Sequence, residues 1–296
     1  MRLCRFDGGA LGLVDGDSVR DVSAALDVLP SYRYPLPEHD VVISNLDAVR
    51  TRIAQLPAGP SVPLASVKLL SPVANPGKIV CAPVNYQKHL DEVRDQAQLH
   101  QGNQGHMAPI HTAGLFLKAT SSLVGPGEGI ALRKLDRRND HEVELAVVIG
   151  KTICNASKDV ALAAVAGYAI GLDITIRGPE ERSLRKSPDS YAVLGPWLVT
   201  ADEIPNPGAL DLRIAVNGEE RQNSNTRYLI LGVAELIEYA SSFYTLHPGD
   251  VIITGTPEGV GMGRKPPEWL KPGDVMELEI ERIGVLRNVI GGGVMK

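Results

Sequence analysis

Two acidic residues, Glu142 and Glu144, stand two positions apart at the start of a run that is apolar as far as Ile149. In a β-strand, residues i and i+2 project from one face, so these carboxylates would lie side by side, about 7 Å apart. Two carboxylates at that separation can share one cation. The same alternation of Glu with apolar residues recurs at 277–281. The pattern alone therefore fits a half-solvated strand equally well.

The uninterrupted apolar run after Glu144 distinguishes the first strand, because it indicates a strand covered on both faces. Acidic side chains on such a strand need a cation, since moving an unpaired charge out of water costs several kcal/mol. Asp173, which ends the apolar stretch 169–172, offers a third carboxylate. Taken alone, an Asp there is more typical of a turn or a helix cap. Three carboxylates without Cys or His favour Mg²⁺, Mn²⁺ or Ca²⁺ over zinc.

A helix predicted over residues 86–99 carries a histidine and a carboxylate, His89 and Glu92, three residues apart. At that spacing the two side chains are neighbours on one helix face. The carboxylate can orient the imidazole and raise its basicity, which makes a general base near neutral pH. The alternative is an exposed surface pair worth a few tenths of a kcal/mol, and the spacing alone favours it.

Ten consecutive residues, 177–186, contain four cations and two glutamates. The cations are Arg177, Arg182, Arg185 and Lys186. Such a cluster can clamp a substrate carboxylate or stabilise a developing oxyanion. Because mixed charge runs are usually solvated loops, we expect at least two of the four to be solvated. A second mixed run, residues 133–140, is expected to be a solvated connection.

Several other kinds of site are excluded by the motifs. His141–Leu145 begins like the zinc-protease HExxH helix but has Leu in place of the second His. The glycine-rich run 255–265 matches neither the P-loop pattern nor the dinucleotide-binding pattern. The sequence also lacks a GxSxG elbow and any cysteine pair with zinc-like spacing.

Turn signals and apolar periodicity predict short strands and hairpins with a few helices, an α+β order. The Asn-Gly pair at 217–218 is the strongest hairpin signal. We expect residues 1–70 to form a small N-terminal module and 71–296 the catalytic domain. Strands are predicted at 3–6, 11–14, 78–81, 141–149, 197–200, 212–216, 219–222, 251–254 and 275–283, and helices at 86–99, 158–169 and 229–244.

The amino-acid composition argues against two further classes of protein, nucleic-acid binders and membrane-spanning proteins. Thirty basic residues against 35 acidic ones leave a net charge of −5, which lacks the basic excess of a nucleic-acid binder. The longest uncharged apolar stretch, 161–172, is too short for the roughly 20 residues that cross a bilayer. The N-terminus does not read as a signal peptide, and we expect a cytoplasmic protein. Its three cysteines are expected to be reduced and buried.

Together these residues resemble the fumarylacetoacetate hydrolase family over about 71–290. The order and number of the matching stretches carry the resemblance. In chain order they are Pro76–Ile79, Asn85–Glu92, Leu115–Lys118, His141–Gly150, Gly171–Asp173, Lys186–Asp189, Gly195–Ile204, Val216–Glu219 and Pro248–Gly261.

The resemblance implies the family's fold, a rolled mixed β-sheet barrel with peripheral helices, and a homodimer. It also implies roles for residues at the matching positions. Glu142, Glu144 and Asp173 would coordinate Mg²⁺ or Mn²⁺, with Ca²⁺ as a further candidate. His89 and Glu92 would activate water, and Lys186 would assist at the oxyanion. The substrate would contact Tyr86, Lys118, Arg177 and Thr256.

By the same resemblance, the protein would be a metal-dependent hydrolase that cleaves a C–C bond in an acylpyruvate-type 2,4-dioxo acid, in the catabolism of an aromatic compound or a sugar acid. One alternative is a 2-oxo acid decarboxylase or hydratase/isomerase that uses the same metal site. Another is a non-catalytic binding protein that keeps the fold. The expected partner is a small 2-oxo acid, and the segment 94–113 is expected to close over it as a lid.

Overall fold

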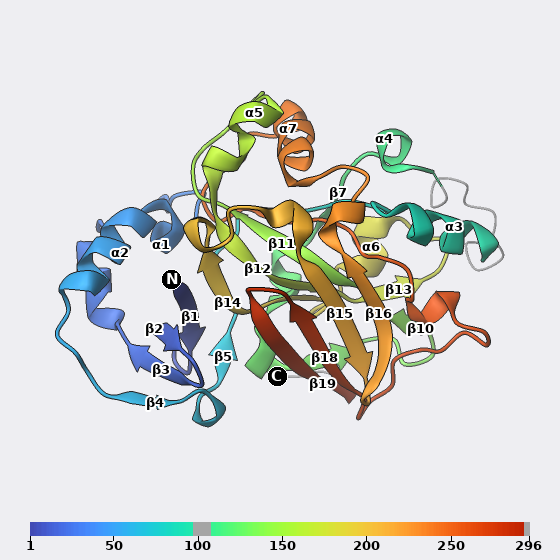
Figure 1. The fold of residues 1–296 in the computed structure, drawn as a ribbon, viewed down its shortest axis with the longest axis horizontal. Helices are drawn as coiled ribbons and strands as arrows, with labels where there is room; N and C mark the ends of the chain where they lie inside the picture. Colours follow the sequence, from blue (N-terminus) through green and yellow to red (C-terminus); the bar gives the residue numbers. More distant parts are fainter. Residues whose placement is uncertain (97–107, 293–296) are drawn as a thin grey trace.

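The computed structural model describes residues 1–96 and 108–292. Three β-sheets dominate these residues, and short helices surround them (Figure 1). This arrangement confirms the α+β class. The helices are α1 (Val41–Ser44), α2 (Leu46–Gln55), α3 (Gln87–Asp95), α4 (Ile110–Ala113), α5 (Lys158–Ala161), α6 (Arg182–Lys186) and α7 (Val233–Phe243).

The largest sheet has twelve strands and is mixed. Its hydrogen-bonded path runs β4-β3-β2-β1-β14-β12-β11-β17-β6-β7, with β5 beside β1 and β8 beside β14. Its strands are β1 (Arg2–Phe6), β2 (Ala10–Asp15), β3 (Ser18–Asp21), β4 (Ser61–Pro63), β5 (Leu69–Leu70), β6 (Ile79–Cys81), β7 (Phe116–Lys118), β8 (Leu123–Val124), β11 (Val143–Ile149), β12 (Val165–Asp173), β14 (Ala192–Thr200) and β17 (Val251–Ile253).

The mixed sheet expected from the family resemblance is present, but it does not close into a barrel. The path ends at β4 on one side and β7 on the other, and these two strands do not pair within the described residues. A barrel needs its first and last strands to share hydrogen bonds. The architecture is therefore an open sheet with packed faces.

Strand β12 replaces the C-terminal part of the helix predicted over 158–169, and residues 162–164 form a 3-10 turn. Only residues 158–161 are α-helical, and the chain becomes extended from Val165. Helix propensity is a weak prior, and tertiary context overrides it here. Strand β12 lies between β11 and β14, and a Cβ at Gly167 would meet the Val199 carbonyl oxygen at 2.2 Å. The small residues therefore allow close packing of a central strand.

The other predicted helices and hairpins are confirmed with small changes of boundary. Helix α3 begins at Gln87 and ends at Asp95, and residues 97–99 of the predicted helix lie outside the described residues. Helix α7 begins at Val233, with Gly232 as its N-cap. The Asn-Gly hairpin connects β15 to β16 in a second sheet of five strands. These strands are β9 (Ile130–Leu132), β15 (Asp211–Val216), β16 (Glu219–Asn225), β18 (Val275–Ile280) and β19 (Gly284–Gly292).

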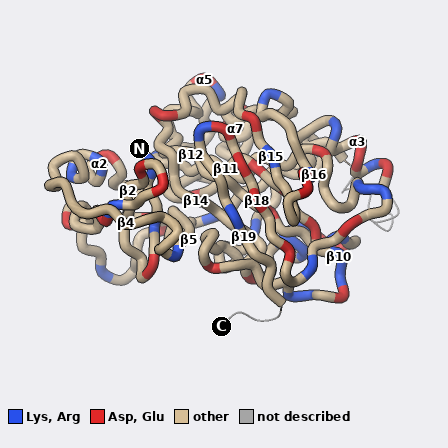
Figure 2. Tube along the Cα trace, turned by 60° about the horizontal axis from the view of Figure 1, so that its bottom comes forward, with Lys and Arg blue, Asp and Glu red and all other residues tan. Residues whose placement is uncertain are grey.

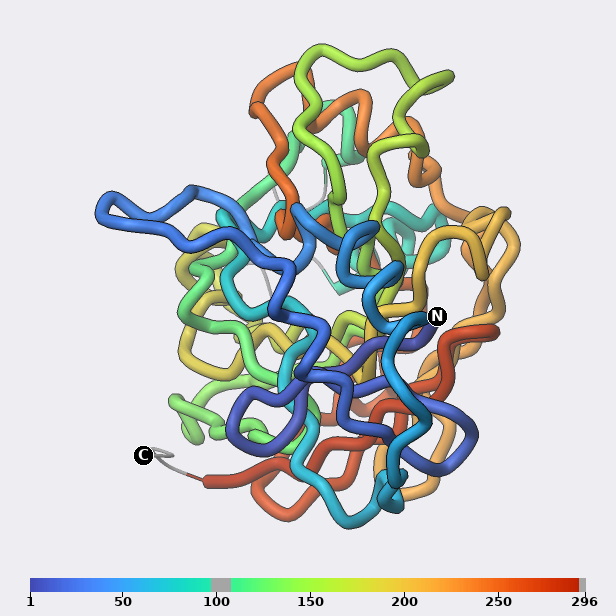
Figure 3. The backbone as a smooth tube through the Cα atoms, turned by 90° about the vertical axis from the view of Figure 1, so that its left-hand side faces the viewer, coloured from blue at the N-terminus to red at the C-terminus, as the bar shows by residue number. Residues whose placement is uncertain are grey.

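The N-terminal strands extend the large sheet, because β1 pairs antiparallel with β14. Figure 3 views the molecule from the side of these first residues. Apolar side chains bury both faces of the sheet in separate clusters. Ile43 and Val49 of α1 and α2 pack with Ala146 and Val148 of β11, whereas α7 packs in the cluster that contains Leu145. Strand β11 is thus covered on both faces, as its apolar run predicts.

Acidic and basic residues are interspersed over the molecule, without one dominant sign (Figure 2). No helix within 1–96 and 108–292 is long and apolar enough to span a bilayer. Cys4 and Cys81 are buried, but Cys154 is exposed. The prediction that all three thiols are buried is therefore wrong for Cys154, which lies in a surface turn after β11.

Candidate metal centre and active site

Strands β11 and β12 bring the three predicted acidic ligands together. In their antiparallel register Glu144 pairs with Gly171, and the Asp173 N–H donates to the Glu142 carbonyl at 3.0 Å. One carboxylate oxygen from each of Glu142, Glu144 and Asp173 lies within 4.8 Å of the other two. All three side chains are buried. The sheet register thus places three oxygen ligands around one point.

Two lysines already supply positive charge to this cluster. The Lys186 Nζ lies 2.5 Å from Glu142 Oε2 and 2.5 Å from Asp173 Oδ2. The Lys118 Nζ donates to Asp173 Oδ1 and, at 2.8 Å, to the Tyr191 carbonyl. Buried carboxylates require such compensation. Lys186 therefore stands where a cation shared by two of the acids would lie.

The positive charge near the three carboxylates is not distributed equally among them. Burial favours the neutral form of Glu142, but Lys186 and Arg177 outweigh it and hold the pKa of that carboxyl well below its usual range. Burial raises the pKa of Glu144 well above its usual range, and the charges of Asp173 and Glu142 raise it further. Among residues 1–96 and 108–292, the Glu144 side chain accepts a hydrogen bond from the Gly255 N–H alone. A divalent cation would satisfy this third acid, and the oxygen-only donor set fits Mg²⁺ or Mn²⁺.

His89 and Glu92 form a pair beside the carboxylates in which His89 is buried and Glu92 is half-buried, not the exposed surface pair that their spacing alone favours. The His89 Nδ1 lies 3.0 Å from Glu92 Oε2, and His89 is 3% exposed. Glu92 Oε1 accepts the Gly259 N–H at 3.0 Å. His89 lines the same cavity as Glu142 and Glu144. The glutamate thus fixes the ring of a histidine that faces the candidate metal ligands.

The basic segment is more buried than expected. Arg177, Arg185 and Lys186 are all 5% exposed or less, whereas Arg182 is half-buried. The expectation that at least two of the four cations are solvated is therefore wrong. Strand β13 (Thr175–Arg177) and helix α6 fold this segment back over the acids, and all four residues line the carboxylate cavity.

Asp140 is a site residue that the sequence reasoning missed, because the run 133–140 was expected to be solvated. It ends strand β10 (Arg138–Asp140), is fully buried, and accepts the Arg177 Nε–H at 2.8 Å. It also accepts the N–H groups of Gly261 and Met262. The Arg177 Nη2 lies 2.8 Å from Glu142 Oε1. Asp140 thus connects the glycine-rich loop to the acid cluster, and only its place directly before the apolar strand signalled this.

Of the three other residues predicted to contact the substrate, Thr256 lines the cavity and Lys118 and Tyr86 do not. Thr256 lines the cavity, and its hydroxyl donates to the Val143 carbonyl at 3.0 Å. Lys118 and Tyr86 are buried but do not line the cavity. The Tyr86 hydroxyl lacks a hydrogen-bond partner among the described residues, and burial raises its pKa well above the usual range. Residues 97–107 of the predicted lid lie outside the described residues, and 110–113 form α4.

The glycine-rich loop requires glycine at Gly255. Its φ of +97° suits glycine, and an added Cβ would lie 2.7 Å from the Asn85 Cβ. This close approach brings the Gly255 N–H to Glu144 and leaves Thr256 at the cavity wall. The open volume among the lining side chains is about 30 Å³. That volume holds an ion or a water molecule, so a bound substrate requires these side chains to move apart.

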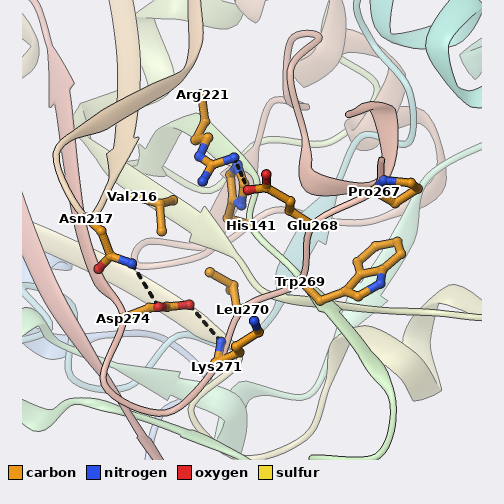
Figure 4. A pocket seen from close by; sticks show the side chains of 10 residues that line it. All are labelled: His141, Val216, Asn217, Arg221, Pro267, Glu268, Trp269, Leu270, Lys271 and Asp274. Carbon is orange, nitrogen blue, oxygen red and sulfur yellow. Dashed lines mark hydrogen bonds and ion pairs between the residues drawn. The ribbon is translucent and has the colours of Figure 1, made fainter. Parts of the chain in front are cut away.

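A second cavity, of about 260 Å³, shares no lining residue with the first. Figure 4 shows its wall, with the Arg221–Glu268 ion pair above Asp274 and the Trp269 ring to one side. None of the predicted site residues lines it. The chemistry therefore belongs to the smaller, more buried cavity.

Three buried carboxylates beside a carboxylate-oriented histidine are the groups that metal-dependent hydrolases use to hold an ion and to activate water. The family model described as "Fumarylacetoacetate (FAA) hydrolase C-terminal" matches residues 78–291. The chain belongs to the fumarylacetoacetate hydrolase family, which confirms the resemblance identified from the motifs.

Individual relatives cover nearly the whole chain. It is 60% identical to maleylpyruvate hydrolase of Aquipseudomonas alcaligenes over 97% of this chain and 98% of that protein. It is 39% identical to 2,4-didehydro-3-deoxy-L-rhamnonate hydrolase of Sphingomonas sp. (strain SKA58), over 98% and 96%. A crystal structure of maleylpyruvate hydrolase from Sphingobium sp. SYK-6 with manganese(II) and pyruvate has a TM-score of 0.82 and 37% identity, and covers 99% of this chain and 100% of that one.

Proposed function

We propose that this protein is a divalent-metal-dependent hydrolase that cleaves a C–C bond in an acylpyruvate-type 2,4-dioxo acid. The observation that carries the proposal is the convergence of Glu142, Glu144 and Asp173 in one buried cluster, of which Glu142 and Glu144 line a cavity together with His89. Similarity to a maleylpyruvate hydrolase, and to a related structure that holds manganese and pyruvate, supports the same reaction class and the same ion.

The three carboxylates would hold Mg²⁺ or Mn²⁺, which supplies Lewis-acid polarisation of a keto oxygen. The other groups act on water and charge. His89, oriented by Glu92, takes a proton from a water molecule, and the water oxygen adds to the distal carbonyl. The C–C bond then breaks, and the released carbon takes up the proton that His89 removed from water, which gives pyruvate and the carboxylic acid of the acyl group. Lys186 stabilises the negative charge that develops on the oxygen of the attacked carbonyl.

Residues around this centre have positioning and binding roles in the proposal. Arg177, held by Asp140, and Thr256 line the cavity and would contact the substrate. Lys118 contacts Asp173, and neither Lys118 nor Tyr86 lines the cavity, so they would contact a substrate that has displaced the lining side chains. Burial of the whole set excludes bulk water and strengthens each electrostatic contact.

A substrate panel tests the proposal directly. Purified protein is mixed with a series of 2,4-dioxo acids, and loss of the enol absorbance is followed with Mn²⁺, with Mg²⁺ and with EDTA. We expect metal-dependent loss of absorbance with stoichiometric release of pyruvate. Absence of pyruvate from every member of the panel with metal present would contradict the proposal.

The variant His89→Ala separates hydrolysis from the alternative chemistries. Hydrolysis should fall on the order of 10²–10⁴-fold, the usual contribution of a general base. A decarboxylase or isomerase that depends on carbonyl polarisation alone would retain substantial activity in the same variant. The matched control is His111→Ala, which changes an exposed histidine in α4.

We further infer a homodimer in the cytoplasm, with residues 1–70 as an N-terminal module and 71–296 as the catalytic domain. The family match over 78–291 supports the second unit. Light scattering coupled to size exclusion tests the dimer, and a monomeric mass with full activity would contradict it. Expression of 71–296 alone tests the division, although the pairing of β1 with β14 predicts reduced solubility for that fragment.

A further inference from the structure

Gln222 is a fully buried amide side chain to which the proposed mechanism gives no role. It lies on β16 of the five-stranded sheet and is 0% exposed. Its Oε1 accepts the Val143 N–H at 3.1 Å. Its Nε2 donates to the Thr256 hydroxyl at 2.8 Å and to the Pro257 carbonyl at 2.7 Å. One side chain of the second sheet therefore contacts both β11 and the glycine-rich loop.

These contacts complete the edge of β11 beyond the end of its neighbour β17. Strand β17 pairs with β11 from Val148 to Ala146 and ends there. Further along the same edge, the Val143 N–H bonds to Gln222, and the Val143 carbonyl accepts the Thr256 hydroxyl at 3.0 Å. A buried backbone group without a partner costs free energy. The two side chains thus take the place of a strand at this point.

Val143 is the residue between two of the candidate metal ligands, Glu142 and Glu144. In a strand, the backbone of one residue sets the separation and direction of the side chains on either side of it. The opposite edge is held by β12, where the Glu142 carbonyl accepts the Asp173 N–H at 3.0 Å. Gln222 therefore helps to fix the strand from the other edge, where the three acids converge.

The contacts of Thr256 also determine how its hydroxyl can bond to a ligand. A hydroxyl has one hydrogen to donate and two lone pairs that accept. The hydrogen goes to the Val143 carbonyl, and the Gln222 amide occupies one lone pair. The hydroxyl is left with one acceptor position, and Thr256 lines the carboxylate cavity. A ligand would then meet Thr256 through an O–H group, which the enol form of a 2,4-dioxo acid carries.

We propose that Gln222 is a positioning residue that fixes the β11 backbone between two candidate metal ligands and orients Thr256 to accept an O–H group of the substrate. The second part rests on the proposed function, whereas the first concerns metal binding and needs no turnover. Gln222 does not line the cavity, so it acts through the residues that it contacts. Replacing a residue that holds metal ligands from behind costs about 10- to 100-fold in metal affinity or activity.

The first test measures metal binding and the β11 backbone without substrate. Gln222→Met keeps the length of the side chain but removes its hydrogen-bonding groups, whereas Gln222→Glu keeps an acceptor for the Val143 N–H. Calorimetry should show Mn²⁺ binding about tenfold more weakly to Gln222→Met. Hydrogen exchange followed by NMR should be about tenfold faster at the Val143 amide in Gln222→Met and stay slow in Gln222→Glu. The matched control is Asn223→Leu, because Asn223 follows on β16 with an exposed side chain.

The second test asks whether Gln222 acts through Thr256. Thr256→Val removes the hydroxyl and keeps the shape of the side chain, and Thr256→Ser keeps the hydroxyl. Gln222→Glu and Thr256→Val should each raise KM for a 2,4-dioxo acid about tenfold and leave kcat within about threefold, as for the loss of a binding contact. Combining the two should give no further loss, because both remove the same contact. Thr256→Ser should retain most of the wild-type KM.

The outcomes separate this proposal from the proposed function. If wild type cleaves no dioxo acid, the proposed function fails, and the Mn²⁺ titration and the exchange rate still decide the role of Gln222 at the strand. Wild-type Mn²⁺ affinity and slow Val143 exchange in Gln222→Met overturn that role. Additive losses in the double variant overturn the effect through Thr256. Urea unfolding in EDTA shows whether Gln222→Met folds, and if it does not, Gln222→Glu and the double variant decide.

Discussion

Strands β11 and β18 carry the same alternation of glutamate with apolar residues but lie in opposite environments. Glu142 and Glu144 are at most 4% exposed and surround a candidate metal site. On β18, Glu277 is exposed and Glu279 is half-buried. The Arg213 guanidinium pairs with Glu279 at 2.5 Å on that surface. One pattern thus gives a buried acidic cluster beside one strand and a row of solvent-exposed charged side chains on the other.

The difference arises from what covers each sheet. Strand β11 is central in the twelve-stranded sheet, and apolar clusters bury both of its faces. Strand β18 belongs to the five-stranded sheet, whose outer face meets water. A period of two identifies the residues that share a face. Whether that face is covered depends on other parts of the chain.

The largest expected effect comes from removing one acid from each strand. Glu144→Gln should lower the hydrolysis rate about a thousandfold. Loss of a metal ligand weakens the stabilisation of the transition-state charge by the ion, which is worth several kcal/mol. Glu279→Gln should leave the rate within about twofold, as expected for a surface change. Steady-state kinetics and Mn²⁺ titration measure both. Unchanged Mn²⁺ affinity in Glu144→Gln would remove the distinction between the strands.

Stability without metal should separate the two environments next. Lys186→Met leaves Glu142 and Asp173 without their shared ammonium, and breaking a buried pair costs about 3–5 kcal/mol. The matched control Lys271→Met alters an exposed lysine and should cost less than about 0.5 kcal/mol. Urea unfolding in EDTA measures the free energies. Adding Mn²⁺ should reduce the difference in unfolding free energy between the two variants, since the ion restores positive charge. An equal loss of unfolding free energy in both variants without metal would contradict the difference in environment.

The pH dependence of metal binding sharpens the comparison within the buried cluster. Burial and its acidic neighbours raise the pKa of Glu144, whereas Lys186 and Arg177 hold that of Glu142 low despite burial. A ligand must lose its proton to bind, so Mn²⁺ affinity should fall about tenfold per pH unit below the raised pKa of Glu144. Calorimetry in buffers of different ionisation enthalpy should find about one proton released, not two. No proton release at neutral pH would contradict a raised pKa.

The smallest change in stability is expected for the exposed ion pair of Arg213 and Glu279. The Arg213 and Glu279 side chains are 50% and 42% exposed, so their coupling in a double-mutant cycle should be about 0.2–1 kcal/mol. Half-molar salt should weaken it further, because screening acts on exposed pairs. Thermal unfolding of the two single variants and the double variant measures the coupling. A coupling as large as that of the buried cluster would mean that the two strands do not differ as described.

Much of the site was predictable because short-range patterns carry chemical information. The apolar run after Glu144 indicated a covered strand, and i, i+3 spacing placed His89 beside Glu92. Helix α5 and strand β12 show the limit of such patterns. The small residues 158–169 predict one helix, but residues 165–169 belong to β12, and their place between β11 and β14 requires an extended chain.

Residue type and spacing along one element are enough to predict which side chains share a face, which family the chain resembles and which ions its carboxylates favour. The burial of Asp140 and Arg185, the contact of Glu92 with Gly259 and the balance of the acids by two lysines are seen only in the folded chain. Burial and charge balance are set by residues far apart in the chain. Their energies therefore depend on how separate elements meet in space.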